Sequence, residues 1–143
     1  MTTLVSKKLP VKGVKLIELP TITDPRGNLI VAEFAHLLPF KIKRFFLIHH
    51  VPSQKVRGEH AHKKCHQFVL CLSGSCLFTI DDGIHQHQIE LDRPSLGLYI
   101  PPLTWAVHSR HTKNTQLAVF ASHPYNPSDY IRNYQTFLTI SIK

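Results

Sequence analysis

Short apolar stretches separated by turn residues run along almost the whole chain. Each stretch is rich in β-branched or aromatic residues and is bounded by proline, glycine or polar residues, which predicts a β-strand. Ten prolines also oppose an all-helical fold. Many short, closely spaced strands predict an all-β fold, an antiparallel sandwich or barrel. The predicted strands cover residues 14–22, 28–34, 41–49, 67–72, 76–80, 84–91, 95–100, 105–109 and 115–122.

Turn residues mark two of the connections. Ser-Gly-Ser at 73–75 predicts a hairpin loop between the strands on either side of it. Asp-Asp-Gly at 81–83 is a second turn signal, and it leads into the next strand.

The C-terminal segment has the signals of a short helix. Asn126 can cap a helix whose first position is Pro127, and Asp129 would lie in the first turn. We therefore expect a helix from this cap through Phe137. Asp129, Tyr130 and Arg132 are expected to anchor it to the barrel or to a dimer partner.

Length and composition fit a single domain. The chain has 143 residues, of which 43% are hydrophobic, enough for one packed core over residues 1–143. No apolar run approaches the roughly 20 residues that span a bilayer, and residues 1–8 lack the apolar region of a secretory signal. The three cysteines, Cys65, Cys71 and Cys76, have no paired spacing. We expect reduced, buried thiols in a cytoplasmic protein.

The chain is strongly basic, with 17 lysines and arginines, nine acidic residues and a formal charge of +8. Such a charge can serve nucleic-acid binding. However, no basic block exceeds two consecutive residues, and no helix-turn-helix, zinc-finger or RNA-binding pattern is present. A small acidic ligand such as a nucleotide accounts for the charge equally well. We therefore expect no nucleic-acid or membrane partner.

His60-Ala61-His62 is the strongest chemical signal in the chain. On an extended strand, residues two apart point to the same face, so both imidazoles enter one pocket. Such a pair can bind a metal or move protons near neutral pH. In metal-binding cupin barrels, the pair is followed by a ligand Glu and then a Gly at a fixed spacing. Here Gly74 holds the Gly position and Gln67 holds that of the Glu. An amide replaces a carboxylate ligand poorly, which favours proton chemistry without a metal.

An ordered series of motifs covers nearly the whole chain, and one His-x-His alone would be a weak signal. The series comprises residues 24–29, 39–44, 57–63, 67, 74–76, 81–83, 97–99, 101, 105, 121–122, 125 and 129–132. On these residues, the chain resembles the sugar nucleotide 3,4-ketoisomerases, the WxcM-like family of cupins.

The resemblance implies a fold and a reaction. The fold is a cupin or jelly-roll antiparallel β-barrel whose subunits dimerise, without cofactor or metal. The substrate is a dTDP-linked 4-keto-6-deoxy sugar, whose carbonyl moves from C4 to C3. The product then serves deoxyaminosugar biosynthesis for surface polysaccharide such as the O-antigen of lipopolysaccharide. A downstream aminotransferase and a fused or separate acyltransferase are the partners that the resemblance implies.

The resemblance also assigns catalysis to His60 and His62. Moving the carbonyl needs a proton taken from C3, one delivered to C4 and one exchanged between the two oxygens. We expect His60 to handle the carbon proton and His62 the oxygen proton. Arg57 and Lys63 flank the pair, but a regular strand would turn both away from its face. The expected substrate-binding residues are Arg26, Arg44, Arg57, Lys63, Gln67, Tyr99, Trp105 and His108.

These binding residues have different expected partners. Arg44 and Lys63 are expected at the pyrophosphate, since their cationic groups bind phosphate oxygens. Arg26 is expected near the sugar. Tyr99 and Trp105 can stack on the thymine or line the pocket.

Ala106 departs from the family pattern, because relatives often have His or Arg after the Trp. Alanine can neither donate a hydrogen bond nor move a proton. His108 shares the face of Ala106 on a regular strand and can substitute. Arg26, where relatives can have Tyr, favours a product with galacto configuration.

Three other functions stay open. A dTDP-sugar 3,5-epimerase-like cupin would use one His base and a Tyr acid, which the pair His60 and His62 opposes. A metal-dependent cupin oxygenase would add His108 as a ligand, which Gln67 opposes. A non-catalytic sugar nucleotide binder is encouraged only by Ala106.

Overall fold

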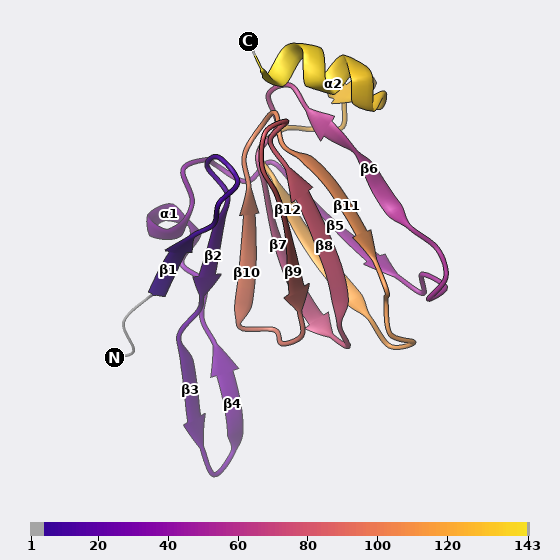
Figure 1. Ribbon diagram of the computed structural model, residues 1–143. Helices are drawn as coiled ribbons and strands as arrows, with labels where there is room; N and C mark the ends of the chain where they lie inside the picture. The colour runs from indigo at the N-terminus through magenta and orange to yellow at the C-terminus, as the bar shows by residue number, and fades with distance from the viewer. Residues whose placement is uncertain (1–4, 143) are drawn as a thin grey trace.

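The computed structural model describes residues 5–142 and shows two antiparallel β-sheets and a projecting hairpin (Figure 1). The first sheet has the order β1 (Val5–Lys8), β2 (Lys15–Glu18), β10 (Leu96–Ile100), β7 (Gln67–Ser73), β12 (Gln116–Ala121) and β5 (Arg44–His49). The second has the order β13 (Tyr130–Ile131), β6 (Arg57–His62), β11 (Trp105–Ser109), β8 (Cys76–Asp81) and β9 (Gln86–Leu91). The hairpin pairs β3 (Thr21–Asp24) with β4 (Gly27–Ile30).

The main core lies between the two sheets. Phe78 and Ile80 of β8 belong to the same buried cluster as Val69 of β7 and Leu98 of β10. Burying each such side chain contributes about 1.5–3 kcal/mol. Since alternate residues of a strand face opposite sides, every second residue enters this core. The predicted jelly-roll barrel is confirmed.

A second apolar cluster covers the outer face of the six-stranded sheet. The short helix α1 (Phe34–Leu37) and the residues around it lie against Phe68 of β7 and Ala118 of β12. The ring of Phe68 occupies the place that a side chain on Gly97 would need, so glycine is required there. This cover fixes the back of the sheet whose front forms one wall of the site.

The helix α2 (Tyr134–Ser141) packs at one end of the barrel (Figure 1). Its Phe137 is fully buried with Ala61 of β6 and Ile131 of β13. The predicted start of this helix is wrong. Asn126 caps only the 3-10 turn η1 (Pro127–Asp129), and Asn133 caps α2 by accepting a hydrogen bond from the Thr136 amide at 2.9 Å. The two stay separate because β13 pairs with β6 between them.

The predicted hairpin at 73–75 is also wrong. β7 pairs with β10 and β12, whereas β8 pairs with β9 and β11, so this turn carries the chain from one sheet to the other. Thr112 and Thr115 hold the turn, at 3.0 and 2.8 Å from the amide and carbonyl of Ser75. Gly74 has a φ of 71° and lies against both threonines, which requires glycine.

The remaining strand predictions are confirmed with changes at the ends, except for 28–34, where β4 ends at Ile30 and Phe34 begins α1. The strand at 105–109 has its predicted bounds. Pro20 separates β2 from β3 within the predicted strand 14–22, because proline supplies no amide to a ladder. The turn at 81–83 joins β8 to β9 as predicted.

All three cysteines are buried free thiols, as predicted. Across residues 5–142, every helix is too short or too polar to cross a membrane.

Candidate active site

A cavity of about 240 Å³ opens between the two sheets. The six-stranded sheet lines it with Phe46, Ile48, Gln67, Val69, Ile100 and Val119. The other sheet and the residue after β13 line it with Arg57, Gly58, His60, Phe78, Ala106, His108, Tyr130 and Arg132. One wall is therefore mainly apolar, and the other carries imidazoles and cations. Because none of these lining residues is acidic, the cavity favours an anionic ligand.

A β-bulge in β6 sets the direction of Arg57. Ala106 lies opposite His60, but the next β11 residue lies opposite Gly58, so Glu59 is an extra residue. Gly58 and Glu59 have φ values of 90° and 54°. One extra residue reverses the alternation of side chains. As a result, Arg57 lines the same cavity as His60, although a regular strand would turn it away.

His60 presents one nitrogen to the cavity. Its Nδ1 lies 2.9 Å from the carbonyl oxygen of Gly58, so Nδ1–H donates and Nε2 is left as the acceptor. Burial lowers the pKa of His60, and the charge of Arg132 acts in the same direction. The bond to Gly58 opposes these two effects because it favours the protonated ring. His60 is therefore a neutral base at neutral pH.

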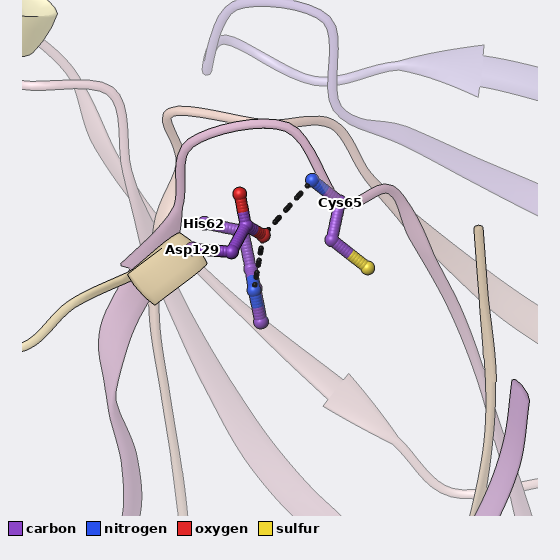
Figure 2. A group of neighbouring side chains, drawn as sticks. All are labelled: His62, Cys65 and Asp129. Carbon is purple, nitrogen blue, oxygen red and sulfur yellow. Dashed lines mark hydrogen bonds and ion pairs between the residues drawn. The ribbon is translucent and has the colours of Figure 1, made fainter. Parts of the chain in front are cut away.

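The ring centroid of His62 lies 5.0 Å from that of His60. Asp129 holds the His62 ring through Nδ1 (Figure 2). The Asp129 Oδ2 lies 3.2 Å from Nδ1 of His62 and 3.2 Å from the amide of Cys65. The other oxygen, Oδ1, accepts from the amide of Lys64 at 2.8 Å. Burial and the neighbouring His60 lower the pKa of His62 to about 4, against the opposing effect of Asp129. Its Nε2 is buried and has no partner within residues 5–142.

Cys65 completes a group with metal-ligand chemistry (Figure 2). A ring nitrogen of His62, the Sγ of Cys65 and a carboxylate oxygen of Asp129 lie within 4.8 Å of one another. However, His62 Nδ1 already faces the carboxylate, and the Cys65 thiol donates to the carbonyl of His66 at 3.4 Å. A metal would have to displace these protons. The donor set fits a hydrogen-bonded carboxylate–imidazole pair better than a metal centre.

Tyr130 lies against His60 and His62, and two arginines near it, Arg44 and Arg132, form a cationic rim of the cavity. Its ring centroid lies 4.9 Å from that of His60 and 4.4 Å from that of His62. The guanidinium of Arg132 lies 4.4 Å from the Tyr130 ring. Arg44 shares the face of β5 with Phe46 and lies 5.2 Å from that ring. Arg44 also lies 5.8 Å from the ring of Tyr125, whose centroid is 5.7 Å from that of Tyr130.

A second imidazole pair lies on the other side of Ala106. His108 Nδ1 is 2.7 Å from Nε2 of His111, and both residues are buried. Burial, then the nearby His111, Arg57 and His60, lower the pKa of His108 to about 3. His108 is therefore neutral over the whole physiological range.

The structure brings several predicted residues together. His60, Arg57, Gln67 and His108 line the cavity as expected of site residues. His62 and Arg44 stand next to it, as the preceding contacts show.

Tyr99 and Trp105 lie outside this cavity, and their roles as ligands stay predictions. Tyr99 precedes the cavity residue Ile100, so it faces the outer cluster, where its hydroxyl lies 2.7 Å from Nδ1 of His66. Trp105 precedes Ala106 in the same way and packs against α2. Alternation along a strand puts neighbours on opposite faces, so Ile100 and Ala106 line the cavity and the residues before them do not.

Lys63 and Arg26 also lie away from the cavity of their own chain. Lys63 is exposed beyond the end of β6, and its amide donates to the carbonyl of Asp129 at 2.8 Å. Arg26 lies in the turn of the β3–β4 hairpin, with 91% of its side chain exposed and an ion pair to Asp24 at 2.7 Å. Their roles as ligands stay predictions.

Sequence reasoning missed Asp129, Tyr130, Arg132 and His111 as site residues. The first three were expected in or near a helix, where they would only anchor it. The sequence signal for these three was a run of charged and aromatic residues at 129–132. In the structure, β13 pairs with the His-x-His strand β6 and brings this run to the site. His111 gave no signal, because only the folded loop after β11 brings it to His108.

The model of the WxcM-like, C-terminal family (FdtA) matches residues 12–141. The chain belongs to this family. It is 40% identical over 123 residues to a TDP-4-oxo-6-deoxy-alpha-D-glucose-3,4-oxoisomerase of Aneurinibacillus thermoaerophilus, covering 86% of this chain and 88% of the relative.

Two solved structures of the family are similarly close. A TDP-quinovose 3,4-ketoisomerase from Campylobacter jejuni has 39% identity and a TM-score of 0.86, over 90% of this chain and 99% of that one. A variant 3,4-ketoisomerase from Thermoanaerobacterium thermosaccharolyticum, solved with TDP-4-keto-6-deoxyglucose, has 38% identity and a TM-score of 0.88, over 92% and 95% of the two chains. The family predicted from the sequence motifs is confirmed.

Proposed function

We propose that this chain is a 3,4-ketoisomerase that converts dTDP-4-keto-6-deoxyglucose to the 3-keto sugar. The observation that carries the proposal is the neutral imidazole of His60, with Nε2 available in a cavity lined by cations and by no acidic group. The relative that is 40% identical and bears the oxoisomerase name supports the substrate class.

His60 moves the carbon proton. Nε2 takes the proton from C3, which leaves an enediolate with its charge on O4. The proton of O3 then passes to O4, and His60 returns its proton to C4, so that the carbonyl lies at C3. The bond from Nδ1–H to the Gly58 carbonyl favours the imidazolium that forms between these steps. A lowered pKa keeps the base unprotonated before reaction.

His62 exchanges the oxygen proton. An ionised carboxylate can only accept, so Asp129 holds the proton of His62 on Nδ1 and leaves Nε2 as the base. The same carboxylate stabilises the imidazolium that forms when Nε2 takes the proton of O3. That proton is then passed to O4, so no net charge remains on the pair.

The cations hold the nucleotide diphosphate. Arg132 lies over the ring of Tyr130, and Arg44 lies beside the rings of Phe46 and Tyr125. These two guanidinium groups can bind pyrophosphate oxygens. Arg57 reaches the cavity through the bulge and faces the sugar.

A homodimer completes the site. The β3–β4 hairpin projects from the barrel and exposes 52% of Ile22 and 57% of Leu29 (Figure 1). Phe45 and Leu47 of the edge strand β5 are exposed as well. A second copy would cover these apolar side chains and bring Arg26 to the partner's sugar. Leu29→Lys should then give monomers in light scattering, and a dimeric variant would contradict this arrangement.

Arg26 in the partner's site favours a 3-keto-6-deoxygalactose product. C4 is protonated from one face of a planar enediol, and groups opposite His60 decide how the ring lies. A small H4–H5 coupling in the product is expected. A large, diaxial coupling would indicate the gluco product instead.

The reaction needs no cofactor, because the carbonyl moves by proton transfers alone. Turnover should survive extended dialysis against EDTA, whereas recovery on adding Fe, Mn or Zn would favour a metal cupin. The 3-keto product has the chemistry that an aminotransferase consumes, and an acyltransferase can follow. Three free thiols fit the reducing cytoplasm as the compartment.

The decisive experiment is incubation with dTDP-4-keto-6-deoxyglucose in deuterated water, followed by NMR of the sugar. We expect the 3-keto product. Deuterium at C5 or unchanged substrate would oppose the isomerase and favour an epimerase or a binding protein.

A further inference from the structure

His108 and His111 form a buried imidazole pair that the proposed proton transfers do not use. The His108 ring stacks on Phe78 with 5.1 Å between centroids and an angle of 28°. Its Nδ1 is engaged with His111 at 2.7 Å. Since the ring is fixed and Nδ1 is occupied, Nε2 is the only nitrogen of His108 available to the cavity that it lines.

A purely structural role explains this pair poorly. His111 is 1% exposed, and its Nδ1 has no partner within the described part of the chain. An unpaired buried polar atom destabilises the fold, whereas an apolar side chain of similar size would not. The contact of His111 with His108 orients an imidazole on the cavity wall. A functional need for this orientation explains why the unpaired buried Nδ1 of His111 is kept.

Ala106 gives a ligand access to His108. Ala106 pairs with His60 across β6 and β11, and His108 follows it on the same face. All three line the cavity. A large side chain at position 106 would stand between the two imidazoles, whereas a methyl group lets one ligand contact both.

We propose that His108 is a further catalytic residue, which donates an Nε2–H bond to the enediolate oxygen, and that His111 positions it. This proposal rests on the isomerase function. His111 Nε2–H donates to Nδ1 of His108, so the single proton of His108 lies on Nε2 and faces the ligand. The opposite direction would bury an N–H of His111 without an acceptor, which proteins avoid more strictly than an unpaired acceptor.

The chemistry needs such a donor. When C3 loses its proton, negative charge develops on O4, and donors already in place lower the barrier. His108 is neutral because burial and the neighbouring His111 and Arg57 lower its pKa. A neutral imidazole donates a hydrogen bond and keeps its proton, so His108 stabilises the enediolate while His60 and His62 carry out the transfers.

The test uses two amide variants of the full chain with dTDP-4-keto-6-deoxyglucose. His108→Asn keeps a polar atom near the Nδ1 position and loses the one at Nε2, whereas His108→Gln keeps a donor that reaches the cavity. We expect His108→Asn to lower kcat about 10²-fold, with KM changed less than about threefold. The kcat of His108→Gln should be about tenfold higher than that of His108→Asn. Circular dichroism and dTDP affinity should be unchanged in both.

Changes around His108 give a second measurement. His111→Leu should lower kcat about tenfold, and His111→Gln, whose amide can still donate to His108, should restore it. Ala106→Leu should lower kcat with every imidazole in place. Val107→Leu is the matched control, since Val107 does not line the cavity.

The outcomes separate the two proposals. Wild-type kcat in His108→Asn, or equal losses in the Asn and Gln variants, would overturn the role of His108 and leave the isomerase standing. Absence of turnover by the wild-type chain, with dTDP still bound, would overturn both.

Discussion

Two buried histidines, His62 and His108, differ in the partner of their Nδ1 atom, and each forms a pair with that partner. His62 Nδ1 faces the carboxylate of Asp129, whereas His108 Nδ1 faces the imidazole of His111. A carboxylate can only accept, and its negative charge raises the pKa of His62 against the effect of burial. His111 supplies no such charge to His108, and burial together with the nearby His111 and Arg57 lowers the pKa of His108 to about 3.

This difference indicates which pair can carry a proton during the reaction. His62 can become an imidazolium because Asp129 stabilises it, as a general base requires. His108 resists protonation and is suited to donating a hydrogen bond. Two imidazoles in one site thus receive different roles from their partners alone.

The largest effect should come from the bases. His60→Asn and His62→Asn should each lower kcat about 10²–10⁴-fold while the fold is kept, since a general base contributes that much. Initial rates with dTDP-4-keto-6-deoxyglucose give the measurement. His85 lies just before β9 with 62% of its side chain exposed, so His85→Asn is the matched control. Near wild-type turnover in both base variants would contradict the mechanism.

Asp129→Asn should remove the carboxylate that distinguishes the surroundings of His62 from those of His108. The amide cannot accept the His62 Nδ1–H and the backbone amides as the carboxylate does, so Nε2 would lose its role as base. We expect kcat to fall about 10²-fold, and His62 to titrate lower than in the wild type by NMR. Asp92→Asn, at an exposed aspartate, should change neither. An unaltered pH–rate profile in Asp129→Asn would remove Asp129 from the mechanism.

The sequence predicted the sheets better than their connections. Period-two apolar patterns located the central strands, because half of each strand is buried between the sheets. The Ser-Gly-Ser turn at 73–75 predicts a hairpin, but such a turn is also compatible with a crossing between two sheets. Only pairing with distant strands decides between them.

The candidate site was predicted where it depends on strand parity and missed where it depends on long-range contacts. His60 and His108 follow from alternation on regular strands. Arg57 required the bulge at Glu59, for which Gly58 is the local signal, since a glycine inside a strand often marks a bulge. Asp129 reaches His62 across 67 positions of sequence, which only the pairing of β13 with β6 explains.

Acid should lower the free energy of unfolding, because His62 and His108 are buried as neutral imidazoles. The folded chain holds His62 at a pKa of about 4 and His108 at about 3, below the unfolded value of 6.5. Between these values the unfolded chain binds more protons, so stability rises with pH up to about 6.5 and is flat above it. His62 alone should contribute up to about 3 kcal/mol to the loss at pH 4.

The measurement is urea unfolding of wild type, His62→Gln and His108→Gln from pH 3.5 to 8. Each variant should show a shallower decline below pH 6.5 than the wild type, because the replaced group no longer titrates. Parallel curves for all three proteins would mean that these imidazoles do not stay neutral in the folded state.

The smallest effect concerns the rim, where Arg44 and Lys63 can be compared directly. Both were predicted at the pyrophosphate, but Arg44 lies beside the rings of Phe46 and Tyr125, whereas Lys63 is exposed beyond β6. dTDP should raise the melting temperature, since a ligand that binds only the folded state stabilises it. Arg44→Ala should weaken dTDP about tenfold, the loss of about 1.4 kcal/mol expected for one charged hydrogen bond, and Lys63→Ala should change it little. A larger loss in Lys63→Ala would place the pyrophosphate at the end of β6. Equal stabilisation by single-stranded DNA of any sequence would instead indicate that the basic rim binds nucleic acid.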